Sequence, residues 1–320
     1  MTGVQTCALP ISLPLFEETL KLQKAKLGPD HPDTLTTMNN QAGGYRAAGK
    51  LDLALPLSEK TLKLRKAKLG PDHPHTLHSM NDLAACYWSV KRLDLSIPLF
   101  EETLKLREKK LGRAHPNTQL TVANLGINYR DAGRLTEALP LLKEAYRASR
   151  TIPSLGWVGA ELLDGYTRAG KAGEATALVK ELAAGARKSL PRESPQLAGM
   201  LAQVGWTLLQ LKAFTDAEPL LRECLAIREK QQAESWTTFN TQSMLGGALL
   251  GQKKYAEAEP LLLKGYEGMK AREKTIPPQG KVRLTEAAER LVQLYEATGN
   301  AADAERWRKE LEAARAKPPK

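Results

Sequence analysis

The chain has 320 residues, a formal net charge of +11, 42% hydrophobic residues and only 5% aromatic residues. This apolar share excludes a disordered chain, and no run approaches the roughly 18 uncharged apolar residues that a membrane-spanning helix needs. Three cysteines are too few for a disulfide framework or a four-thiol zinc site. We therefore expect a soluble, cytoplasmic protein, built either as two domains or as an elongated array.

The first residues look foreign to the rest of the chain. Residues 1–11 read MTGVQTCALPI, which is similar to the translation of a common short-read sequencing adapter with a GTG codon read as the starting Met. A secretory signal fits badly, because no Lys or Arg precedes the short apolar stretch. We therefore expect residues 1–12 to be an adapter artefact, leave Cys7 out of any site, and expect the true N-terminus to be missing.

A repeat of 42 residues organises the chain. Residues 13–54 and 55–96 are identical at 26 of 42 positions, and prolines at 14, 56, 98 and 140 are each 42 residues apart. An aromatic residue or leucine is followed nine residues later by a small residue at seven successive places. These are Tyr45/Ala54, Tyr87/Ser96, Tyr129/Ala138, Tyr166/Ala175, Leu208/Ala217, Leu249/Ala258 and Tyr295/Ala304. The spacing predicts a single helix at about 13–27 and then seven helix pairs, strongest over 13–150 and divergent over 151–315, before a disordered tail at 316–320.

The first complete pair shows what each residue is expected to do. Gly49 suits the left-handed residue that ends a helix, and Ala54 is small where two helices approach closely. The second helix should stop at Gly70, and Pro56 inside it should remove a hydrogen bond and bend it. Asp72 is expected to cap the helix that follows.

These residues match a known repeat. The matching elements are Met38-Asn39-Asn40-Gln41-Ala42, Tyr45, Gly49-Lys50, Ala54, Pro56-Leu57 and Leu69-Gly70-Pro71-Asp72-His73-Pro74. They resemble the tetratricopeptide repeat, in the long variant of kinesin light chains and many bacterial proteins, which favours a bacterial source. The resemblance covers residues 13–315 and implies an all-α, right-handed superhelical solenoid of antiparallel helix pairs. Two departures are Gln41, where leucine is usual, and Arg113-Ala114, which replace Pro-Asp.

The resemblance also indicates a binding surface. In that fold, the residues that face away from the packed side of each first helix line a concave groove, in which an extended peptide lies. The candidates here are Asn39, Asn40, Arg46, Asn81, Trp88, Asn124 and Arg130, with Trp157 and Trp206 at groove-type positions of later pairs. Asn amides can bond an extended backbone, Arg can pair with carboxylates, and Trp is often an energetic centre of interfaces. The alternatives remain open that the Trp side chains fill gaps between helices and that the Asn side chains are solvated or cap locally.

No catalytic, cofactor or metal site is expected. His31, His73 and His115 recur in loops at repeat spacing, which is too far apart to share a metal ion. The stretch from Gly44 to Lys50 has the spacing of a phosphate-binding loop, but it lacks the Ser or Thr and the preceding strand that such a loop needs. Cys86 and Cys224 are expected to pack as small apolar residues.

We therefore predict a non-enzymatic scaffold that binds a protein or peptide ligand of acidic or mixed character and does not bind a membrane. One alternative is the C-terminal regulatory region of a larger signalling protein, such as a bacterial serine/threonine kinase, with the catalytic part missing. Another is polyanion or nucleic-acid binding by a basic convex face. That face would contain Lys60, Lys63, Arg65, Lys66 and Lys68. We expect it to be merely solvated and nucleic-acid binding to be disfavoured, because aromatic residues are not interleaved there.

Overall fold

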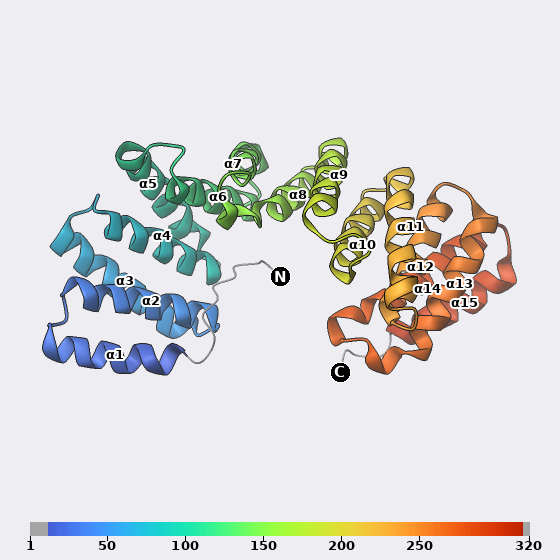
Figure 1. Ribbon diagram of the computed structural model, residues 1–320, viewed down its shortest axis with the longest axis horizontal. Helices are drawn as coiled ribbons and strands as arrows, with labels where there is room; N and C mark the ends of the chain where they lie inside the picture. The colour runs from blue at the N-terminus through green and yellow to red at the C-terminus, as the bar shows by residue number, and fades with distance from the viewer. Residues whose placement is uncertain (1–11, 316–320) are drawn as a thin grey trace. The chain divides into compact units, whose positions relative to one another are not determined.

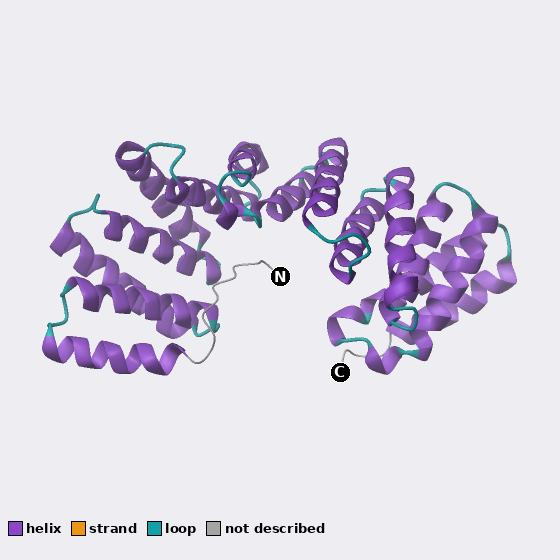
Figure 2. Cartoon of the chain, in the orientation of Figure 1, coloured by secondary structure: helices purple, strands orange, loops and turns teal. Residues whose placement is uncertain are grey.

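The structure is a computed structural model that describes residues 12–315. This part consists of fifteen α-helices and three short 3-10 segments and contains no strand (Figures 1 and 2), which confirms the all-α prediction. None of the described helices combines the length and the apolar character that a membrane span requires. The predictions for residues 1–11 and for the tail at 316–320 lie outside the described residues, and Ser12 is the first residue of the first helix.

The chain divides between Gly170 and Lys171 into two compact units, which we describe separately. Unit 1 contains α1 (Ser12–Lys26), α2 (Pro32–Ala47), α3 (Leu51–Leu69), α4 (Pro74–Ser89), α5 (Leu93–Leu111), α6 (Pro116–Asp131), α7 (Leu135–Ala148) and α8 (Val158–Arg168). A 3-10 segment, Pro153–Leu155, precedes α8. Each helix packs on the next one along the chain, and the first helices of successive pairs, α2, α4, α6 and α8, also contact one another (Figure 1).

Unit 2 repeats this arrangement. It contains α9 (Ala172–Ser189), α10 (Pro195–Gln210), α11 (Phe214–Gln231), α12 (Trp236–Gly251), α13 (Tyr255–Ala271), α14 (Val282–Ala297) and α15 (Ala301–Arg315). Two 3-10 segments, Glu273–Thr275 and Pro278–Gly280, precede α14. The first helices α10, α12 and α14 contact one another in series.

The turn inside each pair has a left-handed residue, as predicted at Gly49. Gly49 has φ +73°, and the N–H groups of Gly49 and Lys50 donate to the carbonyls of Arg46 and Tyr45 at 3.1 and 2.9 Å. This geometry satisfies carbonyls that the end of α2 would otherwise leave unpaired. The same position has positive φ in all seven turns, with glycine in four and lysine in three. The seven residues are Gly49, Lys91, Gly133, Gly170, Lys212, Lys253 and Gly299.

The small residues that the nine-residue spacing identified are buried. All seven are at most 2% exposed. The tyrosine in front of them also has a polar contact, because the hydroxyl of Tyr87 donates to Glu59 of the preceding helix at 2.8 Å. Burial and the Glu59 carboxylate together raise the pKa of Tyr87 to about 12.

One local expectation is corrected. Asp72 does not cap α4: the N-cap is His73, whose Nδ1 accepts from the N–H of His75 at 3.2 Å, while Asp72 pairs with Lys110 of α5 at 3.0 Å. The N–H of His75 needs this acceptor because it is among the first N–H groups of α4, which have no intrahelical partner, and Pro74 before it has no N–H of its own. Pro56 does lie inside a helix, and α3 continues past it to Leu69.

Arg65 is not part of a solvated basic face. It is 2% exposed, whereas Lys60, Lys63 and Lys68 on the same helix are exposed. Its guanidinium donates to the carbonyl of His75 and to the hydroxyl of Ser79, both at 2.8 Å. The prediction failed because it treated all basic residues of the second helix alike, although Arg65 lies on the side that packs against α4.

Candidate functional site

Unit 1 contains a hollow of about 700 Å³ beside α4 and α6, which we call the Trp hollow. Its walls come from the C-terminal end of α2, from α4, α5 and α6, and from the segment that precedes α8. The lining residues are Arg46, Asn81, Asp82, Ala85, Trp88, Phe100, Leu120, Asn124, Ile127, Asn128, Pro153, Ser154, Gly156 and Trp157. Four predicted groove residues therefore lie together here, namely Arg46, Asn81, Trp88 and Asn124.

Two indoles form part of the wall. The Nε1 of Trp88 donates to Asp131 at 2.9 Å, and the Nε1 of Trp157 donates to the carbonyl of Ser154 at 2.9 Å. Both side chains are half-buried, so their N–H groups are satisfied while part of each ring stays accessible. Such a ring offers a large apolar surface whose orientation is already fixed before a ligand arrives.

The amides of Asn81 and Asn124 meet on the floor. The Nδ2 of Asn124 approaches the Oδ1 of Asn81 at 3.5 Å, and Thr121 donates to the same oxygen at 3.4 Å. Among the described residues, no hydrogen bond uses the Nδ2 of Asn81 or the Oδ1 of Asn124. One donor and one acceptor are thus left at the hollow, the two groups that a peptide backbone can pair with.

Arg46 is the one lining cation, and its side chain forms neither an ion pair nor a hydrogen bond with residues 12–315. Its Nε is buried without a partner. The nearby carboxylate of Asp82 is occupied instead by the Nδ2 of Asn39 at 2.6 Å and by His78 at 3.4 Å. The guanidinium of Arg46 therefore has no carboxylate partner in the described part of the protein, and an incoming carboxylate would supply one.

The other three predicted residues do not line the Trp hollow. Asn39 is buried, and its Oδ1 accepts from Ser79 at 2.7 Å and from Arg65 at 3.4 Å. Asn40 is exposed on α2. Arg130 is 4% exposed and engaged in an ion-pair cluster, so its guanidinium is not presented to a ligand.

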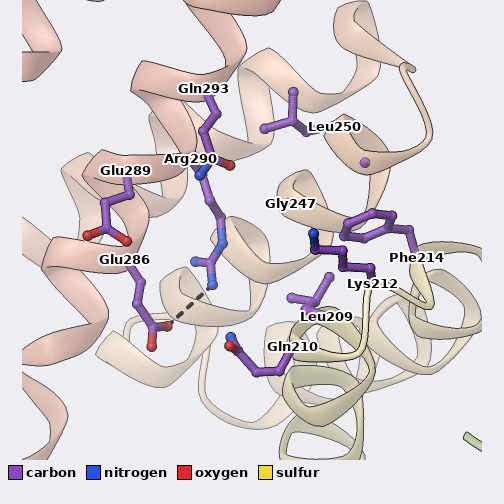
Figure 3. Close-up of a pocket in the computed structure, with 11 residues that line it drawn as sticks. Leu209, Gln210, Lys212, Phe214, Gly247, Leu250, Glu286, Glu289, Arg290 and Gln293 are labelled. Carbon is purple, nitrogen blue, oxygen red and sulfur yellow. Dashed lines mark hydrogen bonds and ion pairs between the residues drawn. The ribbon is translucent and has the colours of Figure 1, made fainter. Parts of the chain in front are cut away.

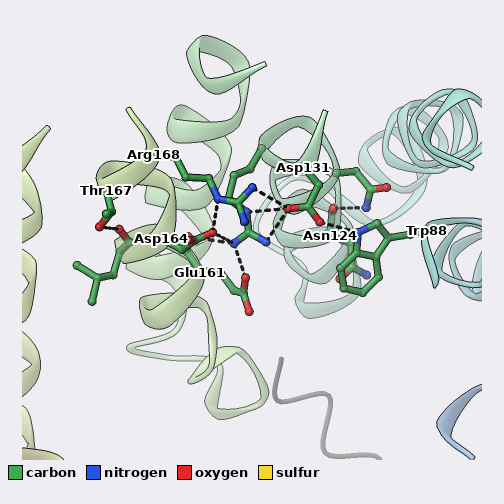
Figure 4. Close-up of polar contacts among 10 residues, drawn as sticks. Trp88, Asn124, Asp131, Glu161, Asp164, Thr167 and Arg168 are labelled. Atoms are coloured by element: carbon green, nitrogen blue, oxygen red, sulfur yellow. Dashed lines mark hydrogen bonds and ion pairs between the residues drawn. The ribbon is translucent and has the colours of Figure 1, made fainter. Parts of the chain in front are cut away.

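This cluster joins α6 to α8 (Figure 4). Arg130 pairs with Asp131 at 3.0 Å, with Glu161 at 2.5 Å and with Asp164 at 3.2 Å. Arg168 adds a second cation, 2.8 Å from Asp164. Burial opposes the charge of Arg130, but the carboxylates outweigh it and raise the pKa of Arg130. Because Asp131 also accepts from Trp88, the cluster fixes one wall of the Trp hollow.

Sequence reasoning missed the acidic members of this cluster. Glu161 and Asp164 are three residues apart on α8, a spacing that places them on one helix face. The signal was present, but it lies in the divergent fourth pair, where the repeat gives no register. Trp157, at a groove-type position, does line the Trp hollow, whereas Trp206 belongs to unit 2 and lies under the guanidinium of Arg283 at 4.6 Å.

The histidines have local roles. His31 and His115 cap α2 and α6 in the way that His73 caps α4. Within the part of the chain that the structure describes, no three His, Cys, Asp or Glu side chains are grouped so that they could hold a metal ion.

Comparisons with known proteins agree with this architecture. A family model described as Tetratricopeptide repeat matches residues 9–67, 37–109 and 80–151, and a second model of the same description matches residues 197–230. A comparison with curated proteins found no match.

Solved structures show the same fold. The nearly identical TPR-like repeats of a putative kinesin light chain from Podosopora anserina are 25% identical, with TM-score 0.57, over 63% of this chain and 98% of that one. The C-terminal part of a TPR repeat-containing protein from Cytophaga hutchinsonii is 15% identical, with TM-score 0.54, over 86% and 94%. A signal transduction ATPase with a tetratricopeptide repeat sensor from Pyrococcus horikoshii is 15% identical, with TM-score 0.51, over 98% of this chain and 48% of that one.

Proposed function

Because this chain belongs to the tetratricopeptide repeat family, we propose that it is a non-enzymatic binding module whose Trp hollow takes an extended segment of a partner protein. The observation that carries the proposal is the hollow itself, about 700 Å³ in volume and lined by two indoles, three Asn amides and an unpaired arginine. This combination of apolar wall and few polar groups is typical of ligand sites.

The lining chemistry specifies the ligand. An apolar or aromatic side chain would lie between Trp88 and Trp157, where it buries surface against rings that are already ordered. A carboxylate on a nearby residue of the same segment would pair with the guanidinium of Arg46, which has no ion-pair partner among the described residues. The Nδ2 of Asn81 and the Oδ1 of Asn124 would bond the backbone of the segment. The preferred ligand is therefore a mixed acidic and apolar segment.

A direct test selects peptides on the full chain. A library of random 12-residue peptides is displayed on phage, and the strongest binder is resynthesised and titrated by fluorescence polarisation. We expect the selected peptides to combine an acidic residue with an aromatic or large aliphatic one. Arg46→Gln and Asn124→Ala should each weaken binding by about tenfold, the loss expected for one charge-assisted or well-placed hydrogen bond.

The control variant is Asn40→Ala, because Asn40 is exposed on α2 outside the hollow. It should leave the affinity unchanged. If the double variant Arg46→Gln and Asn124→Ala bound the selected peptides as tightly as the original chain, the Trp hollow would not be the binding site.

Polyanion binding is less favoured by the contacts of the basic residues. Lys68 pairs with Asp30 at 2.8 Å, Lys110 with Asp72 at 3.0 Å and Lys66 with Glu102 at 3.7 Å. These pairs join successive repeats and use positive charge that a polyanion would need. No specific contact of the described residues favours a role as the regulatory region of a larger signalling protein.

A further inference from the structure

Unit 2 has a hollow of its own, about 330 Å³ in volume, which we call the Lys212 hollow (Figure 3). It lies where the end of α10 and the α10–α11 turn face α12 and α14. One wall is apolar and is formed by Leu209, Phe214 and Leu250. The opposite wall is the face of α14 that carries Glu286 and Arg290 (Figure 3).

Arg290 is built into this site rather than lying at its rim. It is only 9% exposed, and its guanidinium donates to the hydroxyl of Ser243 at 3.1 Å and to Glu286 at 3.3 Å. Its stem crosses α12 at Gly247, where an added Cβ would lie 2.9 Å from the Cδ and the Nε of Arg290. The absence of a side chain at position 247 therefore allows the guanidinium to reach the hollow.

The two carboxylates that line this hollow are already paired with arginines outside its lining. Glu286 is shared, because Arg283 also donates to it at 2.7 and 3.0 Å. The second lining carboxylate, Glu289, is paired with Arg315 at 2.6 Å. Lys212 forms no ion pair with any residue that the structure describes. The lining therefore holds two cations and two carboxylates, and Lys212 is the lining cation without a counter-charge among the described residues.

Arg290 is also poorly compensated electrostatically. Burial lowers the pKa of Arg290 and the charge of Arg283 adds to this effect, while Glu286 and Glu289 oppose it without outweighing it. A buried guanidinium in this state is stabilised by any additional anion that can reach its exposed edge.

We infer that the Lys212 hollow binds a carboxylate, held between the ammonium of Lys212 and the guanidinium of Arg290, with its aliphatic stem against Leu209, Phe214 and Leu250. The carboxylate belongs either to a small organic acid or to an acidic side chain of a peptide. Every lining residue is in unit 2, so this site is separate from the Trp hollow.

The inference is tested on the full chain by isothermal titration calorimetry. The background variant is Arg46→Gln, so that the Trp hollow does not contribute a carboxylate contact. The two probes are glutarate and the tripeptide acetyl-Leu-Glu-Leu-amide, which separate the two sources of the carboxylate. The neutral counterpart is acetyl-Leu-Gln-Leu-amide. We expect at least one acidic probe to bind and the glutamine peptide to bind about tenfold more weakly or not at all.

Lys212 allows a variant that removes the charge without harming the fold. Its φ is +57°, a left-handed conformation in which glycine is less strained, so Lys212→Gly should keep or raise the melting temperature. Lys253 has φ +63° at the same position of the next turn and does not line the hollow, so Lys253→Gly is the matched control. We expect Lys212→Gly to weaken the acidic probe by about tenfold and Lys253→Gly to leave it unchanged.

Three results would overturn the inference. The first is the absence of binding by both acidic probes at millimolar concentration. The second is equal binding of the Glu and Gln peptides, which would mean that the carboxylate is not recognised. The third is an equal effect of Lys212→Gly and Lys253→Gly.

Discussion

Buried arginines recur at an equivalent position on several of the second helices. Arg65, Arg107 and Arg228 are at most 8% exposed. Each donates through Nη1 to a backbone carbonyl and to a hydroxyl of the next first helix, as Arg107 does to Asn117 and Thr121, both at 2.6 Å. Burial lowers the pKa of Arg107 to about 10. The planar guanidinium holds two atoms of the next first helix at once. Each arginine therefore fixes the orientation of that helix relative to its own helix.

Glu218 is a negatively charged residue that also links one helix pair to the next. Its carboxylate accepts from Gln252 at 2.8 Å, Lys254 at 3.0 Å and Arg222 at 2.9 Å. Burial alone would raise its pKa, but these donors outweigh burial and hold the pKa of Glu218 at about 2, below the ordinary 4.5.

A pH dependence follows from this shift. A depressed pKa contributes stability that is present above about pH 4.5 and is lost as the pH falls towards about 2. Glu218→Gln should therefore lower the free energy of unfolding by about 1–2 kcal/mol at pH 7, and the difference should shrink between pH 4.5 and 2. Urea unfolding at several pH values measures it. Glu267→Gln, at an exposed site on α13, should show no such trend, and a constant difference for Glu218→Gln would contradict the assignment.

The first helices of the early repeats depend on an uncommon cap. The Nδ1 of His73 accepts from the N–H of His75 at 3.2 Å, and His31 and His115 do the same in their own repeats. We expect His73→Ala to cost about 1 kcal/mol, the usual value of a lost N-cap. His73→Asn should cost much less, because its side-chain oxygen can accept the same bond. Thermal unfolding of the two variants compares them, and equal losses would mean that the imidazole stabilises α4 by packing instead.

The sequence predicted a residue's role where that role depends on contacts within the residue's own helix pair. Tyr45 and Ala54 predict a helix pair because they lie nine residues apart along the chain, one on each helix of the pair. The environment of Arg130 was not predictable, because Glu161 and Asp164 reach it from α8, whose register the divergent fourth copy does not reveal. Asn39 illustrates the same limit. Its spacing places it on the groove side, but Arg65 and the next first helix use its amide.

At the scale of the whole molecule, stability depends on stacking between neighbours. In such an array each helix pair is stabilised by the pairs next to it, so equal sequences in different surroundings need not be equally stable. Residues 13–27 and 55–69 provide this comparison, because α1 and α3 have nearly the same sequence. Leu15 and Leu22 of α1 are 64% and 54% exposed. Their equivalents on α3, Leu57 and Leu64, are half-buried and pack against the cluster of Leu20, Leu35 and Met38.

The rates of amide hydrogen exchange should therefore differ between α1 and α3. Intrinsic exchange rates of α1 and α3 are similar because their sequences are, so a difference in protection reports their surroundings alone. We expect amides of α1 to exchange about a hundredfold faster than the corresponding amides of α3, which equals about 2.7 kcal/mol less local stability. Mass spectrometry after proteolysis measures both segments in one sample. Equal protection would contradict this expectation and would mean that the exposed leucines of α1 are covered in solution, by a second copy of the chain or by another segment. Dilution would distinguish these two cases. Protection by a second copy of the chain would be lost at low protein concentration, whereas protection by another segment of the same chain would persist.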